Sequence, residues 1–195
     1  MYLISIEGAD SSGKTTVAKL VLEYLKENHI RSVYIHEGEV RPNAETPFLS
    51  EFFSLKDPWV RDLLYTALTI STIQRGLAPL SDDTVVILDR YVDSLAVYLD
   101  EHTDYEMAEY VREFVTSIAW DAPTPLLTLF CNTPLEEIGR RRKALGAHFD
   151  PVYEAEIIQR FKSRLGRLQT RVVEIHPSTS PVDILNTVRC RLKLF

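Results

Sequence analysis

The sequence predicts a doubly wound α/β fold, in which helices cover both faces of a parallel β-sheet. Five short β-prone runs support this prediction, at residues 3–6, 33–36, 85–89, 126–130 and 172–175. Most of these runs are almost continuously apolar, which is typical of parallel strands that are covered on both faces. Helical patterns separate the runs, and strands that alternate with helices indicate this class of fold. The ligand crevice of such sheets lies beyond the carboxyl ends of the strands.

The helices are predicted from the spacing of apolar residues. Between residues 17 and 25, apolar side chains recur three and four positions apart, so we expect a helix soon after the first strand. Similar patterns predict further helices around residues 63–68, 105–120, 154–168 and 182–194. The connections between parallel strands are expected to be right-handed crossovers.

Length and composition limit what the chain can do. A chain of 195 residues is expected to form one domain, residues 1–195. No apolar run approaches the roughly 18 residues of a membrane span, and the first residues lack the basic start and apolar core of a signal peptide. The net charge of −6 argues against a nucleic-acid-binding surface, which would be basic. Cys131 and Cys190 are expected to be reduced core thiols of a cytoplasmic protein.

A phosphate-binding loop (P-loop) is the most specific motif. Residues 8–15 read Gly-Ala-Asp-Ser-Ser-Gly-Lys-Thr and match G-x-x-x-x-G-K-[ST] in full, between a predicted strand and a predicted helix. Backbone N–H groups of such a loop converge on an anion at the positive end of the helix dipole. Lys14 is expected to reach the β- and γ-phosphates of ATP, and the Thr15 hydroxyl to join the Mg²⁺ shell. The expected ATP-binding residues are Gly8, Ala9, Asp10, Ser11, Ser12, Gly13, Lys14, Thr15 and Thr16.

Two acidic residues and one arginine accompany this loop. Asp10 lies inside the loop, where its carboxylate would be repelled by phosphate. We therefore expect Asp10 either to approach Mg²⁺ or to hydrogen-bond a hydroxyl of the molecule that accepts the phosphoryl group, the acceptor. Asp89 and Arg90 stand at the end of the third predicted strand. Asp89 occupies the place where P-loop enzymes put the carboxylate that holds Mg²⁺. Arg90 would donate two hydrogen bonds to a phosphate.

Together these motifs resemble the thymidylate kinases. In the first half of the chain, the likeness is carried by residues 4–10, the rest of the P-loop, Asp89-Arg90-Tyr91 and Ser94. In the second half, it is carried by residues 124–130, Thr133-Pro134, an arginine-rich stretch and residues 178–181. In that family, the loop that matches residues 178–181 lies near the adenine of ATP. The resemblance therefore covers nearly the whole chain in order.

The resemblance implies a P-loop kinase with a five-stranded parallel sheet, the reaction ATP + dTMP → ADP + dTDP with Mg²⁺, and a homodimer. By position, Asp10 would contact the acceptor or its Mg²⁺, and Arg90 would contact the acceptor phosphate. Arg41 matches another phosphate-binding arginine only in part, because residues 37–42 depart from the usual Arg-Glu-Pro-Gly-Gly pattern. The acceptor-binding residues implied in this way are Asp10, Arg41, Tyr65, Thr69, Arg90 and Tyr98.

A basic cluster, residues 140–143, is expected to follow a helix and to begin a short lid over about residues 140–152. Four adjacent cations cannot share one helix face, so some should face solvent, while others stabilise the charge that spreads over the transferring phosphoryl group. Thymidylate kinases carry a catalytic arginine either in the P-loop or in the lid. Because this P-loop contains no arginine, the lid type is implied. The expected catalytic residues are Lys14, Asp10, Arg90 and, in order of preference, Arg142, Arg141 and Arg140.

The acceptor is less well defined than the donor. In the family, an aromatic residue stacks on thymine and an arginine four residues later hydrogen-bonds it. Tyr65 fits the first place, but Thr69 stands in the second. Losing a base-reading hydrogen bond can change specificity greatly, so another or a modified deoxynucleotide is an alternative acceptor. A deoxynucleoside kinase is a second alternative, in which Glu37 or Glu39 would act as the general base for a hydroxyl acceptor.

Two alternatives lie outside the enzymes. A P-loop switch protein would carry an Asn-Lys-x-Asp sequence that reads guanine, and this sequence is absent. No Asp-x-x-Gly switch follows the third predicted strand either. A scaffold with a vestigial site would not need the complete Gly-Lys-Thr that the chain retains. The sequence therefore favours a kinase that uses ATP and Mg²⁺ on a small nucleotide.

Overall fold

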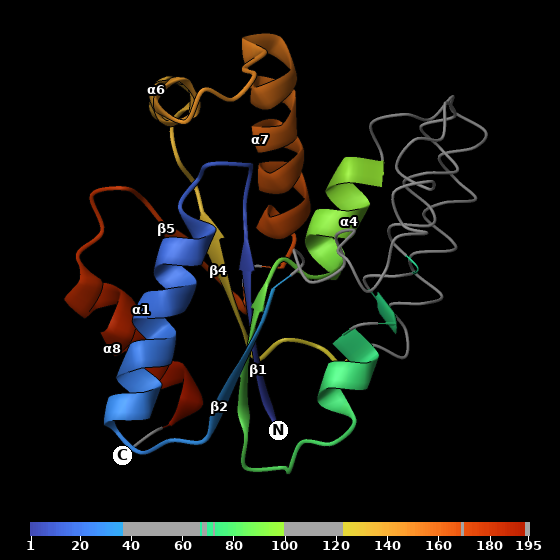
Figure 1. Ribbon diagram of the computed structural model, residues 1–195, viewed down its shortest axis with the longest axis vertical. Coiled ribbons are helices and arrows are strands. Elements are labelled where there is room, and N and C mark those ends of the chain that lie inside the picture. The colour runs from blue at the N-terminus through green and yellow to red at the C-terminus, as the bar shows by residue number, and fades with distance from the viewer. Residues whose placement is uncertain (37–66, 68–69, 72, 100–122, 169, 194–195) are drawn as a thin grey trace.

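Five strands form one parallel sheet within residues 1–36, 67, 70–71, 73–99, 123–168 and 170–193, which the computed structural model describes. The strands are β1 (Tyr2–Glu7), β2 (Ser32–His36), β3 (Val85–Asp89), β4 (Leu127–Cys131) and β5 (Val172–Ile175). Their order is β2-β3-β1-β4-β5, with each neighbouring pair parallel (Figure 1). All five predicted strands are confirmed, and each end lies within one residue of its expected place.

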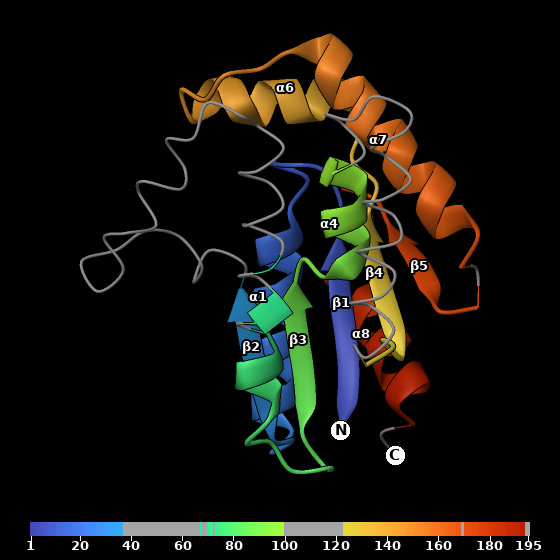
Figure 2. The same cartoon turned by 90° about the vertical axis from the view of Figure 1, so that its right-hand side faces the viewer.

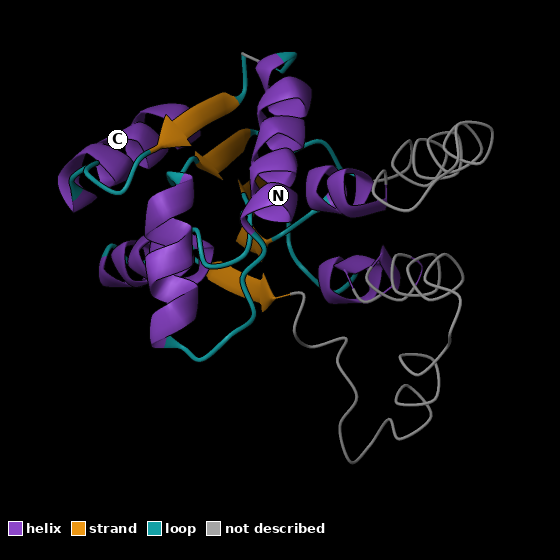
Figure 3. Cartoon of the chain, turned by 90° about the horizontal axis from the view of Figure 1, so that it is seen from above, coloured by secondary structure: helices purple, strands orange, loops and turns teal. Residues whose placement is uncertain are grey.

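Helices cover both faces of this sheet, as predicted for a doubly wound fold. They are α1 (Lys14–Glu27), α4 (Val92–Leu99), α6 (Leu135–Ala144), α7 (Pro151–Gly166) and α8 (Pro181–Leu192). In Figure 1, α1 and α8 lie on one side of the sheet and α4 and α7 on the other, and Figure 3 shows the same layers from above. Figure 2 shows α6 lying across the carboxyl ends of the strands. Residues 73–77 are also helical, whereas the helix expected around 105–120 lies outside the described residues.

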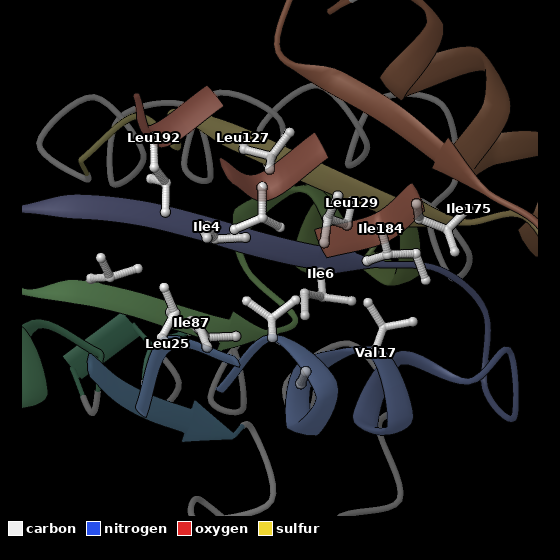
Figure 4. Close-up of a cluster of buried hydrophobic side chains, with 14 of the residues drawn as sticks. Ile4, Ile6, Val17, Leu25, Ile87, Leu127, Leu129, Ile175, Ile184 and Leu192 are labelled. Carbon is white, nitrogen blue, oxygen red and sulfur yellow. The ribbon is translucent and has the colours of Figure 1, made fainter. Parts of the chain in front are cut away.

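Helix α1, which follows the P-loop, is held in position by its packing against the sheet. Val17, Val21 and Leu25 of α1 pack against Ile4 and Ile6 of β1, as Figure 4 shows for several of these side chains. Each fully buried aliphatic side chain of this size contributes about 1.5–3 kcal/mol. The apolar spacing that predicts the helix is therefore the spacing that anchors it on the sheet.

The side chains of β1 alternate between the two faces of the sheet. Ile4 and Ile6 belong to the cluster beneath α1 and α8, whereas Leu3 belongs to a cluster on the opposite face. Because successive residues of a strand point to opposite faces, Ser5 and Glu7 share the face of Leu3. Both of these polar side chains are fully buried. The strand therefore delivers a carboxyl group into the interior directly before the P-loop.

A buried ion pair holds the layer of α4 and α7 together. Asp93 of α4 accepts a hydrogen bond of 2.8 Å from Arg164 of α7 and one of 3.0 Å from Arg171, which precedes β5. Asp93 is almost fully buried, and the two cationic partners offset the cost of burying its side chain. Nearby, Phe161 of α7 stacks on Phe130 of β4 with ring centroids 6.0 Å apart.

Two expectations about the second half of the chain are corrected. Helix α7 begins at Pro151, three residues earlier than expected, because the Asp150 side chain caps the N–H groups of Val152 and Tyr153 and proline suits the first helical turn. The basic cluster does not follow a helix but lies within the last turns of α6. There its cations are stabilised by the negative end of the helix dipole.

The two cysteines differ from each other. Cys131 is buried at the end of β4, as expected, but Cys190 of α8 is exposed, so the prediction of a second core thiol was wrong. Its apolar neighbours along the chain face the sheet, while Cys190 lies on the outer side of the helix. None of the helices in the described residues is both long and apolar enough to cross a membrane.

Candidate active site

Two glycines give the P-loop its shape. Gly8 has a φ angle of 143° and Gly13 one of 103°, a region that residues with a side chain rarely adopt. A Cβ atom on Gly8 would lie 2.8 Å from the carbonyl oxygen of Cys131, so the loop can pass β4 only with glycine at this position. Gly13 is the N-cap of α1 and has no side chain to satisfy the first N–H groups of the helix. Those N–H groups therefore suit an anion.

Lys14 places a cation inside this loop. Its side chain is buried, and Nζ donates a hydrogen bond of 2.8 Å to the carbonyl oxygen of Ala9. Burial, with help from Arg90, lowers the pKa of Lys14 to about 8, although Asp10 and Asp89 oppose the change. A phosphate group in the loop would favour the charged form again.

A cavity of about 500 Å³ opens beside the P-loop, which is in the usual range for a site that holds a small molecule. The loop and the start of α1, including Thr16, form one wall. Thr179 and Pro181, from the segment that the resemblance puts near adenine, line the same cavity. Arg141 and Leu145 close it from the side of α6 and the residue that follows it. Of the predicted ATP-binding residues, 11–16 line this cavity, whereas Gly8, Ala9 and Asp10 do not.

The end of β3 divides the crevice into two sides. Asp89 is directed toward α1, where it accepts a hydrogen bond of 2.7 Å from the Thr15 hydroxyl. Arg90, the next residue, lies toward the opposite side, where its guanidinium meets Asp10 and Tyr98. Because β3 ends at Asp89 and Arg90 follows outside the strand, these two adjacent residues enter different environments. Arg90 also has a positive φ angle of 75°, a strained backbone conformation of the kind found at functional sites.

On the side of α1, the carboxylate of Asp89 suits a magnesium ion. Oδ2 of Asp89 accepts hydrogen bonds from Thr15 and, at 2.9 Å, from the Tyr34 hydroxyl, and Nδ1 of His36 lies 3.9 Å from it. Oδ1 is buried and has no hydrogen-bond partner among the described residues. A metal-bound water would satisfy this oxygen. Mg²⁺ at phosphate sites commonly takes one or two carboxylates and keeps several waters, so the residues present fit the ion.

On the opposite side of the crevice, Asp10 joins two arginines. One carboxylate oxygen pairs with Arg90, and the other lies 3.3 Å from Nη2 of Arg142. Burial alone would raise the pKa of Asp10, but Arg90, Lys14 and Arg142 outweigh it and hold the pKa below its usual value. The guanidinium of Arg90 also lies 4.9 Å from the centre of the Tyr98 ring. Burial raises the pKa of that phenol to about 12, so it remains a neutral hydrogen-bond donor.

The three arginines of the lid have three different environments. Arg142 is largely buried and pairs with Glu154 of α7 at 2.5 Å as well as with Asp10, while its Nε has no partner among the described residues. Arg141 donates a hydrogen bond of 3.1 Å to the P-loop carbonyl of Ser11. Arg140 is 70% exposed and pairs with Glu137. Of the three, Arg142 is the one that contacts Asp10, and the catalytic order of the lid arginines stays a prediction.

Several residues of the site escaped the sequence interpretation. Glu154, which holds Arg142, is an unremarkable acid in a charged amphipathic helix, and burial raises its pKa. Tyr34 and His36 stand two residues apart on β2, and His36 is the register partner of Asp89. Knowledge that β2 neighbours β3 would have revealed them. The predicted acceptor residues Arg41, Tyr65 and Thr69, and the candidate bases Glu37 and Glu39, lie outside the described residues.

These observations define the class of protein. A complete P-loop, a strand-end acid beside the P-loop threonine, and an arginine-rich helix all face one crevice at the carboxyl edge of a parallel sheet. This is the arrangement of a P-loop phosphotransferase, in which donor and acceptor phosphates meet between the loop and the lid.

Comparison with known proteins makes the assignment specific. The family model for thymidylate kinase matches residues 6–187, so the chain belongs to the thymidylate kinase family and is a nucleoside monophosphate kinase by class. A thymidylate kinase of Mesoplasma florum is 25% identical over 95% of this chain and 92% of its own length. The thymidylate kinase of Lactobacillus acidophilus is 27% identical over 93% of this chain and 88% of its own length. The thymidylate kinase of Caldanaerobacter subterraneus subsp. tengcongensis is 32% identical over 71% of this chain and 68% of its own length.

Proposed function

We propose that this enzyme transfers the γ-phosphoryl group of ATP to the phosphate of dTMP, forming ADP and dTDP. The observation that carries the proposal is the convergence of Arg90, Asp10 and Arg142 on one point beside the P-loop. The Asp10 carboxylate joins two cations that are suited to phosphate oxygens. The names of the similar proteins support thymidylate as the acceptor.

In the proposed reaction, an oxygen of the acceptor phosphate attacks the γ-phosphorus of ATP. The bond between the γ-phosphorus and the bridging oxygen breaks, and its electron pair remains on the β-phosphate of ADP. Because the acceptor phosphate is already ionised, no general base is needed. Lys14 would bind the β- and γ-phosphates, Arg90 would orient the acceptor phosphate, and Arg142 would stabilise the charge on the transferring group. Residues 140–152 would act as the lid that excludes water from this transfer.

We propose that Asp89 and Thr15 hold Mg²⁺ together with the phosphates of ATP. The ion, when bound, neutralises charge on the β- and γ-phosphates. Support comes from Oδ1 of Asp89, which is buried and has no hydrogen-bond partner among the described residues, and from the hydrogen bond that Oδ2 accepts from the Thr15 hydroxyl. Asp10 is assigned to the acceptor side, because its two carboxylate oxygens contact Arg90 and Arg142.

The variant Asp89→Asn is expected to raise the Mg²⁺ concentration for half-maximal activity at least tenfold and to lower kcat about 100-fold. The amide keeps the size of the side chain but loses the charge that attracts the ion. A magnesium titration at saturating ATP measures both effects. Asp83→Asn, at an exposed position just before β3, is the matched control and should leave the titration unchanged. An unaltered magnesium requirement in Asp89→Asn would remove Asp89 from the metal site.

The acceptor is tested with a panel of nucleotides. ADP release from ATP and Mg²⁺ is measured with dTMP, dUMP, the other deoxynucleoside monophosphates, UMP, CMP, thymidine and deoxyadenosine. The highest kcat/KM is expected with dTMP. Higher turnover of another monophosphate would show that Thr69 redirects the specificity. Turnover of nucleosides alone would favour a deoxynucleoside kinase, with Glu37 or Glu39 as the base to test.

The homodimer and the cytoplasmic location stay predictions. Sedimentation or light scattering of the purified protein tests the first of these, and a molecular mass near twice that of one 22.4 kDa chain is expected.

A further inference from the structure

Glu7 is a buried acid that the proposed reaction does not use. It is the last residue of β1 and directly precedes the P-loop, and its side chain is fully buried. The hydroxyl of Ser94, in α4, donates a hydrogen bond to Oε2 of Glu7. Oε1 is also buried and has no hydrogen-bond partner among the described residues. An apolar residue would fill this place at a lower desolvation cost, so the carboxyl group calls for a reason other than packing.

Ser94 connects Glu7 to the arginine of the acceptor side. Nη1 of Arg90 lies 3.4 Å from the Ser94 hydroxyl oxygen and 3.4 Å from the carbonyl oxygen of Gly8. Its other terminal nitrogen pairs with Asp10 and lies 3.4 Å from the Tyr98 hydroxyl. One edge of the guanidinium is therefore anchored to the interior, while the other faces the crevice.

We propose that Glu7 is a positioning residue that acts through Ser94 to orient Arg90 for the acceptor phosphate. The inference rests on the proposed function, because it assumes that Arg90 binds that phosphate. Glu7 lies behind Arg90 and does not itself reach the crevice, since it is fully buried. Holding a flexible arginine in advance lowers the entropy that is lost when the acceptor binds.

The charge state of Glu7 suits this role. Burial, followed by the charge of Asp93, raises the pKa of Glu7 to about 8, while Ser94, Arg90 and Lys14 oppose the change. Glu7 is therefore mostly protonated at neutral pH. A protonated carboxyl group holds Ser94 without competing electrostatically with the acceptor phosphate for Arg90, whereas an ionised one would compete.

The remaining neighbours leave this balance undisturbed near neutral pH. Asp93 is paired with both Arg164 and Arg171. The Tyr91 hydroxyl and the Cys131 thiol also lie near Glu7, and burial raises the pKa of each well above neutral pH. Glu7 and Lys14 are thus the groups of this cluster that titrate near pH 8, and Lys14 lies on the donor side.

The test measures dTMP binding by calorimetry without ATP, and the KM values for dTMP and ATP. Ser94→Ala and Glu7→Ala are each expected to weaken dTMP binding about tenfold, the loss that corresponds to one hydrogen bond to a charged group. The KM for ATP should change less than twofold. Glu7→Gln, which keeps a neutral hydrogen-bonding group, should restore binding at pH 7. Wild-type affinity for dTMP should fall above pH 8, and Glu7→Gln should show no such fall.

Ser5→Ala is the matched control. Ser5 shares the strand and the face of Glu7, is also fully buried, and loses a single hydrogen bond of 2.8 Å to Thr128. It should lower the melting temperature without changing the affinity for dTMP. Wild-type affinity for dTMP in Ser94→Ala and Glu7→Ala would overturn this inference but not the proposed function. So would an alkaline fall that persists in Glu7→Gln. A wild-type enzyme that turned over no nucleoside monophosphate would overturn the proposed function and this inference together.

Discussion

Replacement of Lys14 by alanine is expected to lower kcat at least 1,000-fold while leaving the fold intact. The lysine is the cation inside the P-loop, and its removal leaves the loop without the positive charge that would bind the β- and γ-phosphates. The fold should survive, because alanine is the best helix former and the ammonium group is held only by a carbonyl oxygen and nearby charges. Burial already lowers its pKa, which means that the charged form is costly without phosphate.

Steady-state kinetics, together with far-ultraviolet circular dichroism and thermal melting, measure this effect. Lys19→Ala provides the control, since Lys19 is an exposed lysine on the same helix. Its kcat should stay within a factor of two of the wild-type value. If Lys14→Ala retained near-normal turnover with ATP, the assignment of the P-loop as the donor site would be wrong.

Arg142→Lys is expected to lower kcat about 1,000-fold and to raise the KM for the acceptor less than tenfold. Lysine keeps the charge that Glu154 needs but loses the planar fork and the Nε–H group, which has no partner among the described residues. The loss should fall on kcat because charge spreads over the phosphoryl oxygens mainly in the transition state.

The adjacent lid arginines separate a catalytic effect from a general loss of positive charge. Arg140→Lys is the matched control, because Arg140 is exposed and pairs with Glu137 on its own helix. It should leave kcat unchanged. Arg141→Lys should mainly raise the KM for ATP, since Arg141 lines the donor cavity and contacts the P-loop carbonyl of Ser11. An unchanged kcat in Arg142→Lys, or an equal loss in Arg140→Lys, would move the catalytic charge away from Arg142.

The fold was largely predictable because its signals are local. Strands covered on both faces must be apolar throughout, and the five runs therefore stood out within one residue of their ends. The start of α7 was harder to place. Val152 in its first turn is exposed and does not belong to the buried stripe, and the helix begins where Asp150 and Pro151 supply a cap and a fixed backbone angle. The exposure of Cys190 depends on the rotation of α8 against the sheet, which neighbouring residues alone do not reveal.

The candidate site was predictable where its residues are consecutive. The P-loop and the Asp89-Arg90 pair are each an unbroken run of residues. The structure places the two motifs in contact, as expected. Glu154 could not be predicted, because it reaches Arg142 only through the packing of α7 against α6. Glu7 was visible beside the P-loop, but its role depends on Ser94, which lies 87 residues further along the chain.

Identification of the labelled product tests the central claim most directly. The enzyme is incubated with Mg²⁺, dTMP and ATP that carries a radioactive γ-phosphate, and the nucleotides are then separated. We expect the label in dTDP, with ADP formed in equal amount and little free phosphate. Label in inorganic phosphate alone would contradict the claim, since it would mean that the site hydrolyses ATP without passing its phosphoryl group to the nucleotide.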